Sequence, residues 1–129
     1  MESLSRISFL LLATIVVFHL FSSSGVVEAH GVVLPDGKTL PEFWCVPKIG
    51  ASDADLQKAL DWACSRPEVD CGPIQPGAVC SDPVTVRSRA KFAMNAYYQQ
   101  HFQELNSCDF SGAAELTTDN PSYGNCKYY

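Results

Sequence analysis

The spacing of hydrophobic positions in the middle of the chain predicts a first helix that begins after Ser52. Apolar residues recur there at steps of three and four, the period of one buried helix face: Leu56, Ala59, Leu60, Ala63 and Cys64. Ser52 is a favourable N-cap, and Asp55 three positions later comes close to completing a capping box. Pro67 cannot continue a helix, so we expect it to end before that residue.

A second helix is predicted from Asp82 to about Phe102. Asp82 is expected to be its N-cap, and Pro83 follows at the first helical position, where no backbone donor is needed. One stripe of this helix contains small apolar residues and Tyr97, whose ring we expect to face the core with its hydroxyl satisfied. Beyond the helix the pattern changes to short β-type segments at Ala113–Thr117 and Asn125–Tyr129, separated by a turn.

The first 29 residues have the pattern of a secretory signal peptide. Arg6 provides a positive start, Ile7–Phe21 is apolar, and small residues lie around the expected cleavage point after Ala29. An anchoring transmembrane helix would need about 20 apolar residues, whereas this run is shorter and is interrupted by His19. We therefore expect a secreted protein without a membrane anchor, in which residues 30–42 form a flexible leader and residues 43–129 the domain.

Length and charge narrow the class of protein further. Removal of the predicted signal peptide leaves about 100 residues, which is enough for one domain but far too few for a (β/α)₈ hydrolase barrel of about 250 residues. The whole chain has a formal net charge of −5. Binding to nucleic acid depends on lysine and arginine, so this balance argues against a nucleic-acid partner and favours an uncharged one.

Six cysteines lie within the predicted domain: Cys45, Cys64, Cys71, Cys80, Cys108 and Cys126. In a short secreted chain they indicate disulfides. Zinc sites use closely paired cysteines with two to four intervening residues, and the closest pair here, Cys64 and Cys71, is separated by more than that. We expect no metal and no cofactor. Cys64 and Cys71 can close a small polar loop on their own, and the rest of the connectivity stays open at this point.

The acidic residues do not form a recognisable catalytic pattern. Glycoside hydrolysis needs two carboxylates about 5–9 Å apart across a cleft. Asp82 is accounted for as a cap, Asp70 lies in the cysteine loop, and Asp61 falls on the polar face of the first helix. No G-x-S-x-G motif is present, and His101 has no free cysteine to activate. We therefore do not expect an enzyme.

Aromatic residues favour a binding function. The domain contains more of them than a core already supported by disulfides needs, and a neutral sugar is recognised by aromatic rings together with short amide and carboxylate side chains. Trp44 and Trp62, near cysteines, are expected to pack on disulfides. The side chains predicted to bind the ligand lie mainly on one side of the second helix: Phe92, Asn95, Tyr98, Gln99, Asp109 and Tyr123.

Several motifs together resemble one known family. They are Trp44–Lys48, Leu56–Cys64, Asp70–Gly77, Phe92–Gln99, Cys108–Gly112 and Asn120–Cys126. These segments closely resemble the plant X8 domain, carbohydrate-binding module family 43. The resemblance implies an α+β fold with two main helices packed beside a small antiparallel sheet. It also implies the disulfides Cys45–Cys108, Cys64–Cys71 and Cys80–Cys126, and binding to β-1,3-glucans such as callose and laminarin.

One segment departs from the family pattern. Where members usually have His-Ala-Ser-Tyr, this chain has Arg89-Ala90-Lys91-Phe92, so a tyrosine hydroxyl is replaced by hydrogen. A sugar bound at this face would lose one hydrogen bond, about 0.5–1.5 kcal/mol.

The resulting hypothesis is a monomeric, non-catalytic β-1,3-glucan-binding protein secreted to the plant cell wall. The first alternative is a structural or defence protein with a protein partner, which requires all the aromatic rings to be buried. The second is a glucan hydrolase of minimal size.

Overall fold

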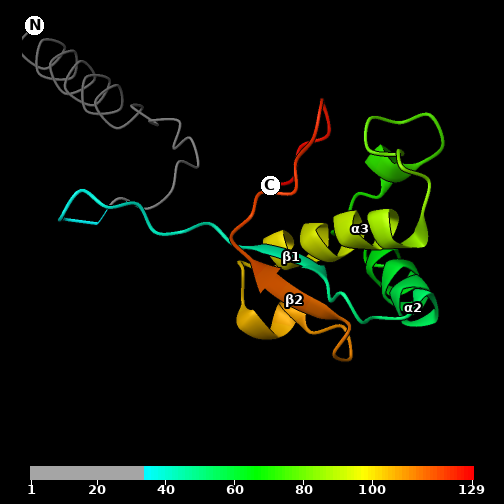
Figure 1. Cartoon of the computed structure of the whole chain (residues 1–129), viewed down its shortest axis with the longest axis horizontal. Helices are drawn as coiled ribbons and strands as arrows, with labels where there is room; N and C mark the ends of the chain where they lie inside the picture. The colour runs from blue at the N-terminus through cyan, green and yellow to red at the C-terminus, as the bar shows by residue number, and fades with distance from the viewer. Residues whose placement is uncertain (1–33) are drawn as a thin grey trace, which may run out of the picture. The chain divides into compact units, whose positions relative to one another are not determined.

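The computed structural model describes residues 34–129, and the predicted signal peptide lies outside the described residues. Residues 39–129 form one compact unit that contains every helix and strand described here (Figure 1). In chain order these are β1 (Trp44–Pro47), α2 (Asp53–Cys64), the 3₁₀ turn η1 (Gly72–Ile74), α3 (Val86–Gln100), the 3₁₀ turn η2 (Leu105–Cys108) and β2 (Ala114–Thr117). The predicted α+β fold with two main helices and a small antiparallel sheet is confirmed.

Helix α2 forms as its sequence predicts. The Ser52 hydroxyl accepts a hydrogen bond from the Asp55 amide (3.1 Å) and donates one to the Asp55 carboxylate (2.8 Å). Of the predicted apolar face, Leu56, Ala59, Leu60 and Ala63 are buried and Cys64 is half-buried, and the helix ends at Cys64, before Pro67. Local capping and a regular apolar period therefore suffice to define this element.

Helix α3 begins later than predicted. Its N-cap is Thr85, whose hydroxyl accepts a hydrogen bond from the Ser88 amide (3.1 Å), so the assignment of this role to Asp82 was wrong. Asp82 lies in the preceding loop, where its carbonyl accepts a hydrogen bond from the Tyr123 hydroxyl. The helix ends at Gln100 because Phe102 has a φ of 54°, in the left-handed region that a right-handed helix does not enter.

The sheet contains one predicted strand and one that the sequence analysis did not assign. β2 agrees with the predicted segment 113–117, and it pairs antiparallel with β1 in a register that joins Trp44 to Thr117 and Pro47 to Ala114. The predicted strand at residues 125–129 is absent from the described structure, which has only an isolated bridge between Tyr123 and Cys126 there. Within this segment the Cys126 backbone bonds to that of Tyr123, while the Tyr128 amide donates to the Ser122 hydroxyl (2.9 Å).

Three disulfides connect these elements, and all three predicted pairs are confirmed. Cys45–Cys108 joins β1 to η2, Cys80–Cys126 joins the loop before α3 to the C-terminal segment, and Cys64–Cys71 closes the loop after α2. The chain-entropy description gives about 4 kcal/mol for each long bridge and about 2.5 kcal/mol for the short one. The largest fully buried side chains are Tyr98, Leu56, Ile74 and Met94. With so few large buried residues, the domain depends on its bridges.

Candidate functional site

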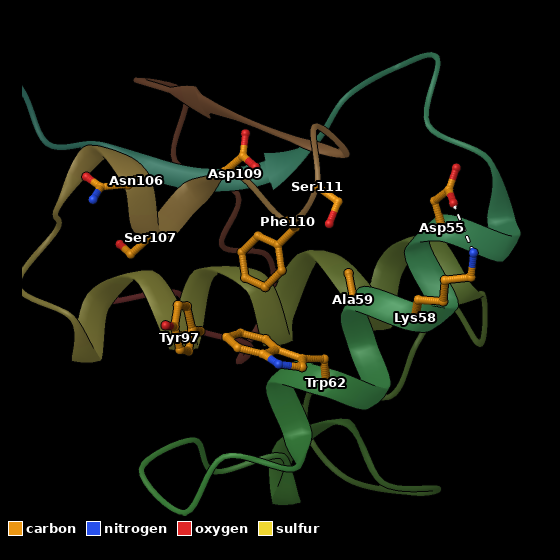
Figure 2. Close-up of a pocket in the computed structure, with 10 residues that line it drawn as sticks. All are labelled: Asp55, Lys58, Ala59, Trp62, Tyr97, Asn106, Ser107, Asp109, Phe110 and Ser111. Carbon is orange, nitrogen blue, oxygen red and sulfur yellow. Dashed lines mark ion pairs between the residues drawn. The ribbon is translucent and has the colours of Figure 1, made fainter.

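A groove of about 550 Å³ lies where α2, α3 and the segment that follows η2 meet. Its volume is within the range of about 300–1,000 Å³ that is usual for small-molecule sites. Figure 2 shows the residues that line it, with aromatic rings in the middle and polar side chains toward both ends. They are Asp55, Lys58, Ala59, Trp62, Tyr97, Asn106, Ser107, Asp109, Phe110 and Ser111.

Three aromatic rings from three different segments form the centre of this groove. Trp62 of α2 contacts Tyr97 of α3 edge to face, with ring centroids 4.8 Å apart, and contacts Phe110 at 5.9 Å. Tyr97 and Phe110 are 5.7 Å apart, again edge to face. Such contacts fix the orientation of each ring. Trp62 is nevertheless 43% exposed, so the cluster presents a rigid apolar surface to solvent.

The backbone after η2 directs Phe110 into the groove. Phe110, Ser111 and Gly112 all have positive φ values, of 48°, 55° and 81°. Left-handed conformations are uncommon for residues other than glycine, and they occur disproportionately at functional sites. The turn is held by hydrogen bonds from the Gly112 amide to the Asp109 carbonyl (2.9 Å) and from the Ala113 amide to the Phe110 carbonyl (3.1 Å). The chain thus accepts an unfavourable local geometry that places this ring beside Trp62.

Two residues of the loop closed by Cys64–Cys71 support the ring cluster. Arg66 places its guanidinium carbon 4.8 Å from the Trp62 ring centroid, a cation–π contact. Glu68 lies 3.5 Å from Nε2 of His101, whose ring stacks on Tyr97 at a centroid distance of 3.8 Å. His101 Nδ1 is 2.8 Å from the Tyr97 carbonyl, and because a carbonyl can only accept, this nitrogen is the donor. The short disulfide loop therefore holds two of the three rings in position.

Polar groups surround the rings. Asn106, Ser107 and Asp109 lie along one side of the groove, whereas Asp55 and Lys58 form an ion pair (3.6 Å) at the other end (Figure 2). The Asp109 side chain is exposed and free to accept hydrogen bonds from a ligand. An apolar platform with amide, hydroxyl and carboxylate groups at its edge suits a ligand with an apolar face and a fringe of hydroxyls.

The six ligand-binding residues predicted from the sequence do not come together in this groove. Asp109 is the only one of them that lines it, while Phe92, Asn95 and Gln99 line a second groove. Tyr98 is 2% exposed and belongs to the hydrophobic core. Tyr123 lies in the C-terminal segment and uses its hydroxyl to bond the carbonyl of Asp82.

Asn95 is also buried, at 2% exposure, and its side chain bonds within the protein. Its Oδ1 accepts a hydrogen bond from the Cys45 amide (3.1 Å), and its Nδ2 donates to the main-chain oxygen of Tyr129 (2.7 Å). These bonds connect α3 to β1 and to the C-terminal segment. In this structure, Asn95 therefore has a structural position rather than an open one.

Two of the three rings that line the first groove were predicted from the sequence to serve packing. Trp62, expected on a disulfide, is open to the groove, and Tyr97, expected to face the core, is half-buried along its wall. The sequence did contain an indication that Trp62 is exposed to solvent. It follows Lys58 by four residues and Asp55 by seven, so a helix places it on the polar, solvent-facing side of α2.

Three further observations concern the described residues. Residues 34–129 contain no group of three or more His, Cys, Asp or Glu side chains placed to hold a metal ion. In the same range, no helix has the length and apolar character needed to cross a membrane. Burial raises the pKa of the Tyr98 hydroxyl and, together with the nearby Tyr123, that of Tyr128, so both stay neutral near physiological pH.

The comparison with known proteins gives the class of this domain. Residues 43–115 match the X8 domain family, and this match covers more than half of the chain. The protein therefore belongs to the X8 domain family, as its motifs indicated.

Individual relatives come from plants. The chain is 50% identical to glucan endo-1,3-beta-glucosidase 7 of Arabidopsis thaliana over 94 residues, which cover 73% of this chain and 18% of that protein. It is 48% identical to plasmodesmata callose-binding protein 5 of the same species, with 67% and 48% of the two chains covered. It is 47% identical to major pollen allergen Ole e 10 of Olea europaea, with 66% and 69% covered. The chain thus spans less than half of the length of the first two relatives.

Proposed function

We propose that this protein binds β-1,3-glucan without cleaving it, through the groove formed by Trp62, Tyr97 and Phe110. The observation that carries the proposal is the edge-packed ring cluster with a 43% exposed Trp62 beside an exposed Asp109. The identity of 48% with a protein named for callose binding supports the choice of ligand, because callose is a β-1,3-glucan.

Binding combines stacking and hydrogen bonding. The C–H face of a glucose ring covers the exposed part of Trp62, and the fixed orientation of the rings limits the entropy lost on binding. Hydroxyls at the edge of the sugar bond to the amide of Asn106 and the carboxylate of Asp109. The ion pair of Asp55 with Lys58 leaves that end of the groove without a net charge, which suits an uncharged polymer.

Several features favour binding over hydrolysis. A general acid in a glycosidase needs a carboxyl group in an apolar environment. The carboxylates of this groove, Asp55 and Asp109, are both exposed, and Asp55 is also paired. The glucosidase relative is matched over only 18% of its length, so its name is a weak guide to this chain.

The alternative of a protein partner is less favoured. That hypothesis required every aromatic ring to be buried, whereas Trp62 is 43% exposed in a groove with polar edges. The predicted signal peptide at residues 1–29 and the three disulfides support a place of action outside the cell, in the plant cell wall. We expect the protein to act there as a monomer.

Retention on insoluble polymers tests this function. The protein is expected to remain on particulate β-1,3-glucan and to pass through cellulose, whereas reduced protein should lose retention because the domain depends on its bridges. Incubation with laminarin is expected to release no reducing ends. Equal retention on both polymers, or on neither, contradicts glucan binding, and released reducing ends contradict the non-catalytic role.

Substitution of His101 by alanine is expected to weaken glucan binding about threefold while leaving the fold intact. The variant removes the ring stacked on Tyr97 and the contact with Glu68, so Tyr97 becomes less well oriented. An aromatic contact of this kind contributes about 0.5–1.5 kcal/mol. Calorimetric titration with a β-1,3-gluco-oligosaccharide measures the change.

Glu104→Ala is the matched control, because Glu104 is exposed nearby and bonds only through its backbone to His101 and Ser107. If His101→Ala and Glu104→Ala bind the oligosaccharide equally well, His101 does not position Tyr97.

A further inference from the structure

A second groove, of about 320 Å³, lies along another face of α3. Phe92, Gln99 and Gln100 of α3 line one side of it, and Tyr128 and Tyr129 of the C-terminal segment line another. Its volume is also within the range of small-molecule sites, about 300–1,000 Å³. None of its lining residues belongs to the first groove.

Like the first groove, the second combines aromatic rings with polar side chains. Phe92 contacts the buried Tyr128 edge to face, with ring centroids 5.4 Å apart, and Tyr129 is 83% exposed. The amide side chains of Gln100 and Asn125, both exposed, lie in the same lining. Rings combined with amide donors and acceptors are the groups that recognise a sugar.

The charges of this groove favour an uncharged occupant. Its lining contains one acidic residue, Asp70, and one basic residue, Lys127. The formal charges of these two side chains cancel, so the side chains of the groove offer no net attraction to a polyanion or to a basic protein surface. A neutral polysaccharide fits both the charge and the composition.

The two grooves face different directions. Tyr97 is the α3 residue of the first groove, and at about 100° per residue the α3 residues that line the second groove lie about 60–160° away from it around the helix, with Gln100 the nearest and Asn95 and Gln99 the farthest. A short stretch of polysaccharide in one groove therefore lies on a different face of the helix from the other groove. Simultaneous occupancy requires two chains, or two distant stretches of one chain.

We propose that the second groove is a second β-1,3-glucan site and that the domain bridges two glucan chains. The inference rests on the proposed function of the first groove, because it assigns the same ligand to both. Bivalence raises retention on a polymer with many chains, since the second contact becomes intramolecular and can increase apparent affinity by about 10²–10⁴.

Titration with a soluble β-1,3-gluco-hexasaccharide counts the sites. The wild-type protein is expected to bind two molecules, whereas Trp62→Ala and the double variant Tyr129→Ala/Gln100→Ala should each bind one. Both residues of the double variant are exposed, and the bond from Asn95 reaches the Tyr129 backbone, so this variant is expected to fold. Phe102→Ala, which removes a 90% exposed ring outside both grooves, is the control.

Bridging has its own readout. Light scattering of long, soluble laminarin is expected to rise with wild-type protein and with Phe102→Ala, but with neither single-groove variant. If the wild-type protein binds one hexasaccharide, and the double variant matches it in affinity and in light scattering, the bivalent assignment is overturned. The proposed function of the first groove is then unaffected. The bivalent assignment is also overturned if the double variant loses all binding while Trp62→Ala binds like the wild-type protein, because the second groove would then be the sole site. A wild-type protein that binds no hexasaccharide contradicts the proposed function itself.

Discussion

Replacement of Trp62 by alanine is expected to weaken the binding of β-1,3-glucan at the first groove about 30-fold. The exposed 43% of this ring represents on the order of 100 Å² of apolar surface that a sugar can cover. At about 25 cal/mol per Å², the loss is about 2 kcal/mol, and each 1.4 kcal/mol corresponds to a tenfold change in Kd. Calorimetry with an oligosaccharide, or the concentration needed for half-retention on particulate glucan, measures it.

The control for this variant is Phe102→Ala. Phe102 is 90% exposed and lies outside both grooves, so its removal takes away as much exposed ring without affecting either proposed site. Thermal unfolding of both variants should show that they remain folded, since neither ring is part of the buried core. Equal affinities for the two variants would mean that the first groove does not bind the glucan.

Replacement of Asn95 by alanine is expected to destabilise the domain by about 3 kcal/mol rather than to remove a sugar contact. The variant leaves the buried Cys45 amide without its acceptor and the main-chain oxygen of Tyr129 without its donor. An unsatisfied buried polar group costs about 1–3 kcal/mol. Denaturant unfolding of the oxidised protein measures the difference in the free energy of unfolding.

Asn95→Asp keeps an acceptor for the Cys45 amide but loses the donor to Tyr129 and puts a carboxyl group at a position that is only 2% exposed. Because an unpaired buried charge is costly, its stability at neutral pH is expected to be no higher than that of the alanine variant. Gln100→Ala, an exposed amide on the same helix, is the control and should change stability by less than about 0.5 kcal/mol. If Asn95→Ala unfolds at the same denaturant concentration as the wild-type protein but binds glucan more weakly, Asn95 is a ligand-binding residue, as predicted from the sequence.

Local signals predicted those elements that local interactions define. The cap at Ser52 and the apolar period of α2 are properties of neighbouring residues, and both appear in the structure. β1 was missed because four residues become a strand only by pairing with β2, about 70 positions further along the chain. The start of α3 was misplaced because Asp82 and Thr85 are both acceptable caps, and the contact of Asp82 with the distant Tyr123 is invisible in the sequence.

The candidate site was harder to predict than the fold. Phe92, Asn95 and Gln99 do share a face of α3, as their spacing indicated. Helical periodicity, however, does not tell which parts of a face are covered by other segments. The C-terminal segment accepts the bond from Asn95, while the turn at Phe110 makes a groove on the other side. Both depend on tertiary contacts between residues far apart in sequence.

The shortest of the three disulfide loops, closed by Cys64–Cys71, affects the first groove as well as the fold. Arg66 and Glu68 sit within the eight-residue circle closed by Cys64 and Cys71, and they steady Trp62 and His101. Reduction of Cys64–Cys71 alone would leave the two long disulfides to hold the fold. Trp62 would then lose its contact with Arg66, and His101 its contact with Glu68. Selective reduction of Cys64–Cys71 would thus weaken ligand binding while the chain stays folded.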